Sequence, residues 1–218
     1  KTGQNKTYRF YPTEEAARTA FKLGEVTEIA EIVEPSDLTG WSAVSVGKVS
    51  RSDRYVGVFL NISDALLSEK SFRQGLAYAV NKDNFGEPRA SSPISPKSWA
   101  FNPQVKQYNF NPARARELLG TLPREKQENI SINLVTAPSL LAIADKIKAD
   151  WEAVGVKTQI QVSNAPPGDF QALLAIQAIP ADPDQYSFWH STQAATNITN
   201  YGEQAEDKKP RESQRIDL

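Results

Sequence analysis

The residues that could do chemistry gather near the end of the sequence, around its single histidine. His190 precedes Ser191, which suggests a base beside a nucleophile, but neighbouring residues on a strand point to opposite faces and are poorly placed for proton transfer. Asp182 and Asp184 are a carboxylate pair of the kind that acts on glycosidic bonds. Their setting around Pro183 favours a turn and the N-cap of a following helix. We therefore predict structural or ligand-contacting roles here.

Composition excludes several classes of site. The chain has 218 residues, no cysteine, one histidine and a formal net charge of −1. Without cysteine there is no disulfide, thiolate nucleophile or cysteine-ligated metal, and one histidine cannot form a multi-histidine metal site. Neither GxGxxG nor GxxxxGK[ST] occurs. The near-zero charge gives no electrostatic case for nucleic-acid binding. We predict no cofactor, no metal and no catalysis.

Several aromatic residues lie in segments that are typical of loops. They are Trp41, Trp99, Tyr186, Trp189 and Tyr201. For Trp99 and Trp189, packing against the domain and lining a ligand cleft are both open interpretations. Trp151 instead belongs to an apolar helix face, which predicts a place in the core.

The elements that would position these residues alternate between strand and helix. Helices are expected from Thr13 to Gly24, from Ser68 to Val80, from Asn111 to Gly120 and from Leu140 to Gly155, with Thr13 and Asn111 as N-caps. Strands are expected at 8–11, from Val26, on both sides of a turn at 50–53, and at 130–134 and 156–162. A proline-rich extended connection is expected at 86–103. This order predicts an α/β domain with a mixed sheet flanked by helices.

The ends of the sequence suggest a longer protein. It begins at Lys1 and contains no methionine, so we expect a processed or excised piece. No run reaches the roughly 18 apolar residues of a membrane span. Residues 202–218 are mostly polar and charged, which predicts an exit or crossover segment.

Several motifs, in order, resemble family 5 extracellular solute-binding proteins, the oligopeptide-, dipeptide- and nickel-type receptors of ABC importers. YVGVFLN at 55–61 and SFRQGLAYAVNKD at 71–83 are similar to the family's strand ending in Asn and its "RQALAYAIDR". The remaining similarities are FKLGEV at 21–26, YNFNPARARELL at 108–119, WEAVGV at 151–156, DPDQY at 182–186 and NITNY at 197–201.

This resemblance implies a lobe of the type II periplasmic-binding-protein kind. We expect residues 1–201 to be the C-terminal lobe of a two-lobed receptor whose other lobe is missing. Its function would be to capture peptides or a related small solute outside the cytoplasm, in the periplasm or anchored at the cell surface, and to deliver them to a membrane ABC permease. No nucleic-acid partner is expected.

The resemblance also implies ligand-binding residues. Seven positions are expected to face the ligand: Trp99, Gln177, Asp182, Tyr186, Trp189, His190 and Asn197. Peptide-binding members carry an acid for the peptide's amino terminus where this chain has Ile179, so Asp182 substitutes for it or the ligand lacks a free amine. Arg73 is expected to be a structural cap or salt-bridge partner.

Two other functions remain open from the sequence. Some transcription regulators resemble this family fused to a helix-turn-helix, so the chain could be a solute-sensing domain. A carbohydrate-active enzyme that uses Asp182 and Asp184 is the third hypothesis.

Overall fold

The structure is a computed structural model that describes residues 6–200 except 31, 33, 34, 36, 50, 87, 128, 129, 166 and 194. It divides into two compact units, Lys1–Lys48 and Val49–Leu218. The expectation of one lobe over 1–201 did not anticipate this division, and the assignment of these residues to a lobe stays a prediction. The predicted exit segment at 202–218 lies outside the described residues.

Among the described residues of the first unit, the helix is α1 (Glu14–Lys22). The Thr13 side chain accepts a hydrogen bond from the Ala16 amide at 3.1 Å, which confirms the predicted N-cap. Arg18 and Lys22 donate to the Asp37 carboxylate at 3.2 and 2.6 Å. The Lys22 and Arg18 hydrogen bonds and positive charges lower the pKa of this exposed carboxyl.

Three strands expected in or next to this unit are not formed. The segments at 8–11, 26–29 and 43–46 have no strand pairing in the described structure. Tyr8 and Phe10 are 76% and 94% exposed. A strand is held by ladder hydrogen bonds to a neighbour, so alternating apolar residues without such a partner do not make one.

The second unit contains the mixed sheet that was predicted. Its elements are β1 (Arg54–Leu60), α2 (Lys70–Ala79), η1 (Lys82–Phe85), α3 (Pro112–Gly120), α4 (Arg124–Gln127), β2 (Ser131–Thr136), η2 (Pro138–Leu140), α5 (Leu141–Glu152), β3 (Lys157–Val162), β4 (Ala172–Ala178) and α6 (Tyr186–Trp189). The strand order is β1-β4-β2-β3. β1 is antiparallel to β4, whereas β2 is parallel to both β3 and β4.

Two helices of this unit show the end signals that the sequence predicts, α3 at its start and α5 at its end. Asn111 caps α3 by accepting from the Arg114 amide at 2.9 Å, and a proline follows at the first helical position. After α5, Gly155 adopts a φ of +95°, a left-handed conformation that glycine adopts without a steric penalty. Trp151 is 1% exposed and donates its indole N–H to the Leu76 carbonyl, as its predicted core position requires.

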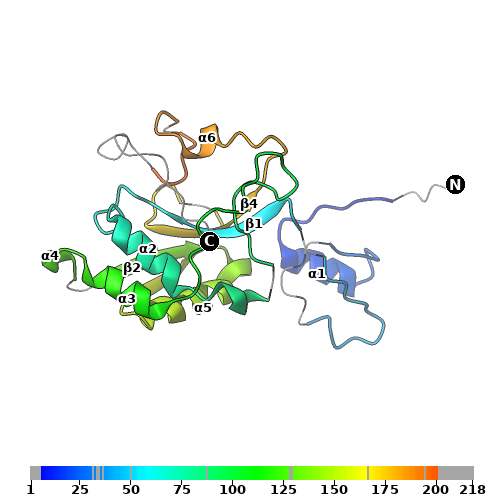
Figure 1. The fold of residues 1–218 in the computed structure, drawn as a ribbon. Helices are drawn as coiled ribbons and strands as arrows, with labels where there is room; N and C mark the ends of the chain where they lie inside the picture. The colour runs from blue at the N-terminus through cyan, green and yellow to red at the C-terminus, as the bar shows by residue number, and fades with distance from the viewer. Residues whose placement is uncertain are drawn as a thin grey trace. The chain divides into compact units, whose positions relative to one another are not determined.

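The two faces of the sheet have different coverings. Helices α2, α3 and α5 pack on one face, whose core includes Val58, Leu134 and Leu174. The other face carries a smaller apolar cluster of Phe59, Val135 and Leu173. Figure 1 shows α6 on this second side, across the sheet from α2, α3 and α5. The segment that contains the sequence-predicted site is therefore attached to the face that the long helices leave uncovered.

Candidate functional site

The segment that follows β4, residues 179–193 and 195–200, is attached to the sheet by an aromatic stack. Trp189 in α6 lies on Phe59 of β1, with ring centroids 6.0 Å apart and an interplanar angle of 20°. Trp189 and Ile198 both pack against the Phe59 cluster. The indole N–H donates to the Gln185 side-chain oxygen at 3.2 Å. Trp189 therefore positions the segment, and its half-buried ring has one side on the sheet.

The end of this segment is tied to the end of β1 by amide side chains. Asn61 is 7% exposed and donates to the Phe170 carbonyl at 3.0 Å. Its side-chain oxygen accepts from the Ser63 amide at 3.1 Å and from the Asn200 side chain at 3.2 Å. The Ile62 amide also donates to the Thr199 carbonyl at 2.9 Å. The segment is thus held at two points, by Trp189 and by Asn61.

Asn197 lies inside this segment and is 7% exposed. Its side-chain oxygen accepts from the amide and the hydroxyl of Thr199, both at 3.2 Å, and its nitrogen donates to the His190 carbonyl at 3.4 Å. Burial and these internal bonds indicate that Asn197 shapes the segment. Asn197 was expected to face the ligand, and that contact stays a prediction beside the internal hydrogen bonds that the structure shows.

Two acidic residues form the turn that leads into α6. Asp182 accepts from the Asp184 amide at 3.0 Å, and Asp184 accepts from the Tyr186 amide at 2.9 Å. Such side-chain-to-backbone bonds two residues along the chain are Asx turns. The predicted turn is confirmed, but the predicted N-cap is wrong, because Gln185 holds that position and makes no side-chain cap bond. Both residues are exposed.

Tyr186 and His190 form a stacked pair on the exposed side of α6. Their ring centroids are 4.2 Å apart at an interplanar angle of 22°. The Thr192 hydroxyl lies 2.8 Å from the Tyr186 hydroxyl and 3.0 Å from His190 Nδ1. The neighbouring Ser191 does not take part in this arrangement, which agrees with the prediction that the His190–Ser191 pair is not set up for proton transfer.

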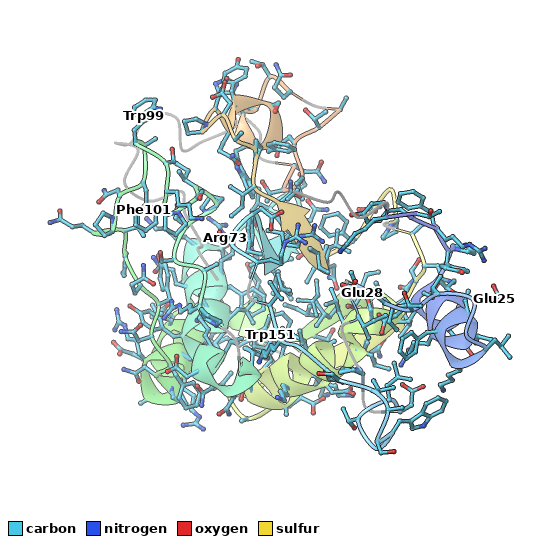
Figure 2. All side chains as sticks on the ribbon, turned by 90° about the vertical axis from the view of Figure 1, so that its right-hand side faces the viewer. Glu25, Glu28, Arg73, Trp99, Phe101 and Trp151 are labelled. Atoms are coloured by element: carbon cyan, nitrogen blue, oxygen red, sulfur yellow. The ribbon has the colours of Figure 1, made fainter. Side chains whose placement is uncertain are left out.

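Gln177 and Trp99 lie on other elements. Gln177 is half-buried on β4, paired opposite Tyr55 of β1, and donates to the Ala178 carbonyl at 3.3 Å. Trp99 lies in a turn closed by a bond from the Phe101 amide to the Ser98 carbonyl. Its side chain is 90% exposed, so it does not pack on the other predicted residues. Figure 2 shows Trp99 on the same side of the sheet as α6, far from Trp151 in the helix layer.

The structure thus brings together Tyr186, Trp189, His190 and Asn197 in one segment, with Asp182 at its start. It does not bring Trp99 against them. The site also depends on Phe59 and Tyr55, which sequence reasoning left out. Their spacing of four along a strand, with Gly57 between them, indicates one shared face. The sequence therefore indicates that Tyr55 and Phe59 share a face of the strand. It does not indicate that Trp189 packs on that face.

Arg73 has the structural role that was predicted for it. Its guanidinium Nη1 donates to the Leu67 and Ser68 carbonyls at 2.7 and 2.9 Å. These carbonyls belong to the turn that leads into α2, and Figure 2 shows Arg73 beside the sheet, well away from Trp99. Within the described part of the chain there is no group of three or more His, Asp or Glu side chains placed to hold a metal ion. None of the described helices has the length and apolar character needed to cross a bilayer.

Comparison with known proteins identifies related chains. The profile of "Bacterial extracellular solute-binding proteins, family 5 Middle" matches residues 5–200. The dipeptide-binding protein of Escherichia coli K12 is 31% identical over 112 residues, which are 46% of this chain and 21% of that protein. This chain therefore spans a small part of the length of the curated relative.

Solved structures show the same fold. The binding protein DppA of Helicobacter pylori, in complex with the peptide STSA, matches with a TM-score of 0.63 and 19% identity over 88% of this chain and 40% of that one. NikZ of Campylobacter jejuni, in complex with Ni(L-His), matches with a TM-score of 0.63 and 22% identity over 71% of this chain and 37% of that one. At these identities the likeness shows the periplasmic-binding-protein fold.

Proposed function

The chain belongs to the bacterial extracellular solute-binding proteins of family 5, and from this premise we propose that it is one lobe of the substrate-binding component of an ABC importer. The lobe would capture a peptide or a related small solute outside the cytoplasm. A second lobe, supplied by the rest of the receptor, would close over the ligand, and a membrane permease would receive it. The observation that carries the proposal is the family match over residues 5–200.

The geometry supports a binding role for the sheet face that carries α6. Exposed groups gather there on a segment that is anchored by Trp189 and Asn61, so their positions are preorganised. Tyr186, His190 and Asp182 would contact the ligand directly. Trp189 and Asn197 would hold the segment in shape.

Gln177 and Trp99 would contribute from outside the segment. Gln177 lies on the same sheet face as Phe59. It is paired directly opposite Tyr55, and Tyr55 and Phe59, four residues apart on one strand, point to the same face. Trp99 is a large ring at a loop turn, on the same side of the sheet, and it would contact a ligand or the closing lobe. Aromatic faces combined with a few oriented polar groups are typical of small-molecule sites.

The named relatives favour this function over the other hypotheses. A dipeptide-binding protein and two solute-bound receptors are similar to the chain, which supports transport over a regulator's sensor domain. The family binds solutes, and the Asx turns at Asp182 and Asp184 give both residues a structural role.

Calorimetry of the complete receptor tests the proposal. Titration with a panel of di- to pentapeptides should show saturable binding, and the Tyr186→Ala variant should bind the same peptide more weakly. Ser187→Ala is a matched control, because its side chain lies on the same short helix. The absence of any heat of binding with peptides, sugars and metal chelates would contradict the proposal.

A further inference from the structure

The His190 ring is held in one orientation by three contacts. One face stacks on Tyr186 with centroids 4.2 Å apart. Nδ1 lies 3.2 Å from the backbone nitrogen of Thr192, which donates to it, and 3.0 Å from the Thr192 hydroxyl. Nδ1 therefore faces its own chain. The ring is exposed, so its other nitrogen, Nε2, is the polar atom available to a ligand.

These contacts determine which nitrogen carries the proton. A backbone amide can only donate, so Nδ1 must offer its lone pair to the Thr192 amide. The neutral ring then carries its proton on Nε2. The hydroxyl bonds fit the same assignment. In this assignment each hydroxyl donates to the next group, from Tyr186 to Thr192 and from Thr192 to His190 Nδ1.

We infer that His190 recognises an oxygen acceptor of the ligand through its Nε2–H, and that it does not bind a metal ion through this ring. The inference rests on the proposed function and specifies the chemistry of the same site. A metal-binding histidine needs an unprotonated nitrogen toward the metal, and its other nitrogen then donates to a carboxylate, carbonyl or water. Here Nδ1, the nitrogen that faces the chain, accepts a hydrogen bond from the Thr192 amide instead. The outer N–H suits a carboxylate or peptide carbonyl oxygen.

The surrounding groups agree with an acceptor. In this assignment the Tyr186 hydroxyl donates to the Thr192 hydroxyl, 2.8 Å away, and the Tyr186 ring stacks on the imidazole. Asp182 and Asp184 each use one oxygen within the turn that precedes the helix. Of the stacked residues Tyr186 and His190, His190 is thus the one with an oriented N–H donor. A ligand oxygen in the plane of the His190 ring would accept this hydrogen bond.

Nitrogen-15 NMR of the 218-residue chain tests the tautomer directly. His190 is the single histidine, so its ring gives one pair of nitrogen signals. At about pH 8.5, where an imidazole in a model peptide is neutral, we expect an unprotonated Nδ1 and a protonated Nε2. A ring with its proton on Nδ1 would overturn the inference, whatever the receptor binds.

Binding by the complete receptor tests the recognition, with trialanine as the probe. His190→Phe retains a ring to stack on Tyr186 but has no N–H, and it should weaken binding about three- to tenfold, the value of one hydrogen bond. His190→Gln places an amide N–H near the position of Nε2 and should recover most of the loss. Ser191→Ala, the matched control, should leave binding unchanged. Equal affinity of the wild type and His190→Phe would overturn the inference.

Two further probes separate the alternatives. Trialanine amide lacks the terminal carboxylate: if His190→Phe no longer weakens its binding, the acceptor is the carboxylate, and if the effect persists, the acceptor is a peptide carbonyl. Bis(L-histidine)nickel(II) probes metal binding, and loss of its binding in both His190→Phe and His190→Gln would overturn the inference. If the receptor binds neither trialanine nor any other peptide, the proposed function fails, and the NMR measurement still decides the His190 assignment.

Discussion

Trp189 stacks on Phe59 with ring centroids 6.0 Å apart, although the two residues lie on elements at opposite ends of the second unit's sequence. Phe59 is buried in β1, whereas Trp189 belongs to a four-residue helix that has no buried residue of its own. A helix of one turn is not stable by itself. Its position therefore depends on what the Trp189 ring contacts, and the stack connects the candidate binding segment to the rigid sheet.

Replacing Trp189 should loosen this segment without unfolding the sheet. In Trp189→Ala, hydrogen exchange of the amides at 185–193 and 195–198 should become faster, while exchange in β1 and β4 should stay the same. The global free energy of unfolding should fall by only about 1 kcal/mol, the scale of one aromatic pair. Trp99→Ala is the matched control, because its ring is 90% exposed and should change neither quantity. Unchanged exchange at these amides in Trp189→Ala would show that the stack does not hold the segment.

Removing the Asn61 side chain should destabilise the whole second unit. Asn61→Ala leaves the Phe170 carbonyl, the Ser63 amide and the Asn200 side chain without this partner in a partly buried place. Unsatisfied buried groups cost about 1 to 3 kcal/mol in total stability, which urea unfolding would measure. Asn102→Ala is the control, since Asn102 also accepts a backbone hydrogen bond but is exposed. Equal midpoints for the two variants would contradict this role.

Four helices and the strands β1, β2 and β3 could be predicted because their signals are local, whereas β4, which pairs with both β1 and β2, was not assigned from the sequence. Thr13 and Asn111 act as caps within three residues of their partners, and Gly155 ends its helix through its own φ. The strands expected at 8–11 and 43–46 failed for the opposite reason. Their apolar alternation is genuine, but a strand also needs a neighbour to accept its hydrogen bonds, and sequence spacing does not reveal whether one is present.

The candidate site could be predicted only in part. The turn at Asp182 and Asp184 was recognised, because an Asx turn requires nothing beyond its own residues. The buried, internal role of Asn197 was not recognised, since it depends on the path of the chain after α6. The contribution of Phe59 was missed as well. The spacing of Tyr55 and Phe59 indicates a shared strand face, but the stack on Trp189 joins residues more than a hundred positions apart, and local spacing does not reveal that contact.

Arg73 should contribute to stability and have little effect on ligand binding. Arg73→Ala removes two bonds from a charged donor to the Leu67 and Ser68 carbonyls, so the free energy of unfolding should fall by about 1.5 to 3 kcal/mol. Arg73→Lys should recover part of this loss, because an ammonium can reach one carbonyl but lacks the planar guanidinium. Arg124→Ala, at an exposed position of α4, is the control for loss of a charge. If Arg73→Ala weakened peptide binding at an unchanged midpoint of unfolding, the structural assignment would be wrong.

Lys82 should make stability rise with pH in the alkaline range. Lys82 is 7% exposed, and its ammonium donates to the Ala77 and Tyr108 carbonyls at 2.5 and 2.7 Å. Burial, with a smaller effect of Arg89, lowers the pKa of Lys82 from 10.5 to about 8, although Asp150 acts in the opposite direction. The folded state therefore releases this proton at a lower pH than the unfolded state does. The penalty of a buried charge is complete below about pH 8 and is relieved as pH rises toward 10.5.

This linkage can be isolated by comparison with Lys82→Met, which keeps the apolar stem and has no proton to lose. Between about pH 7 and 9.5, the free energy of unfolding of the wild type should increase relative to the variant by about 2 kcal/mol, measured by urea unfolding at both pH values. The difference between the two proteins removes the titration of all other groups that they share. A difference that stays constant, or falls with pH, would mean that the two carbonyl oxygens hold the ammonium charged and that burial does not dominate its pKa.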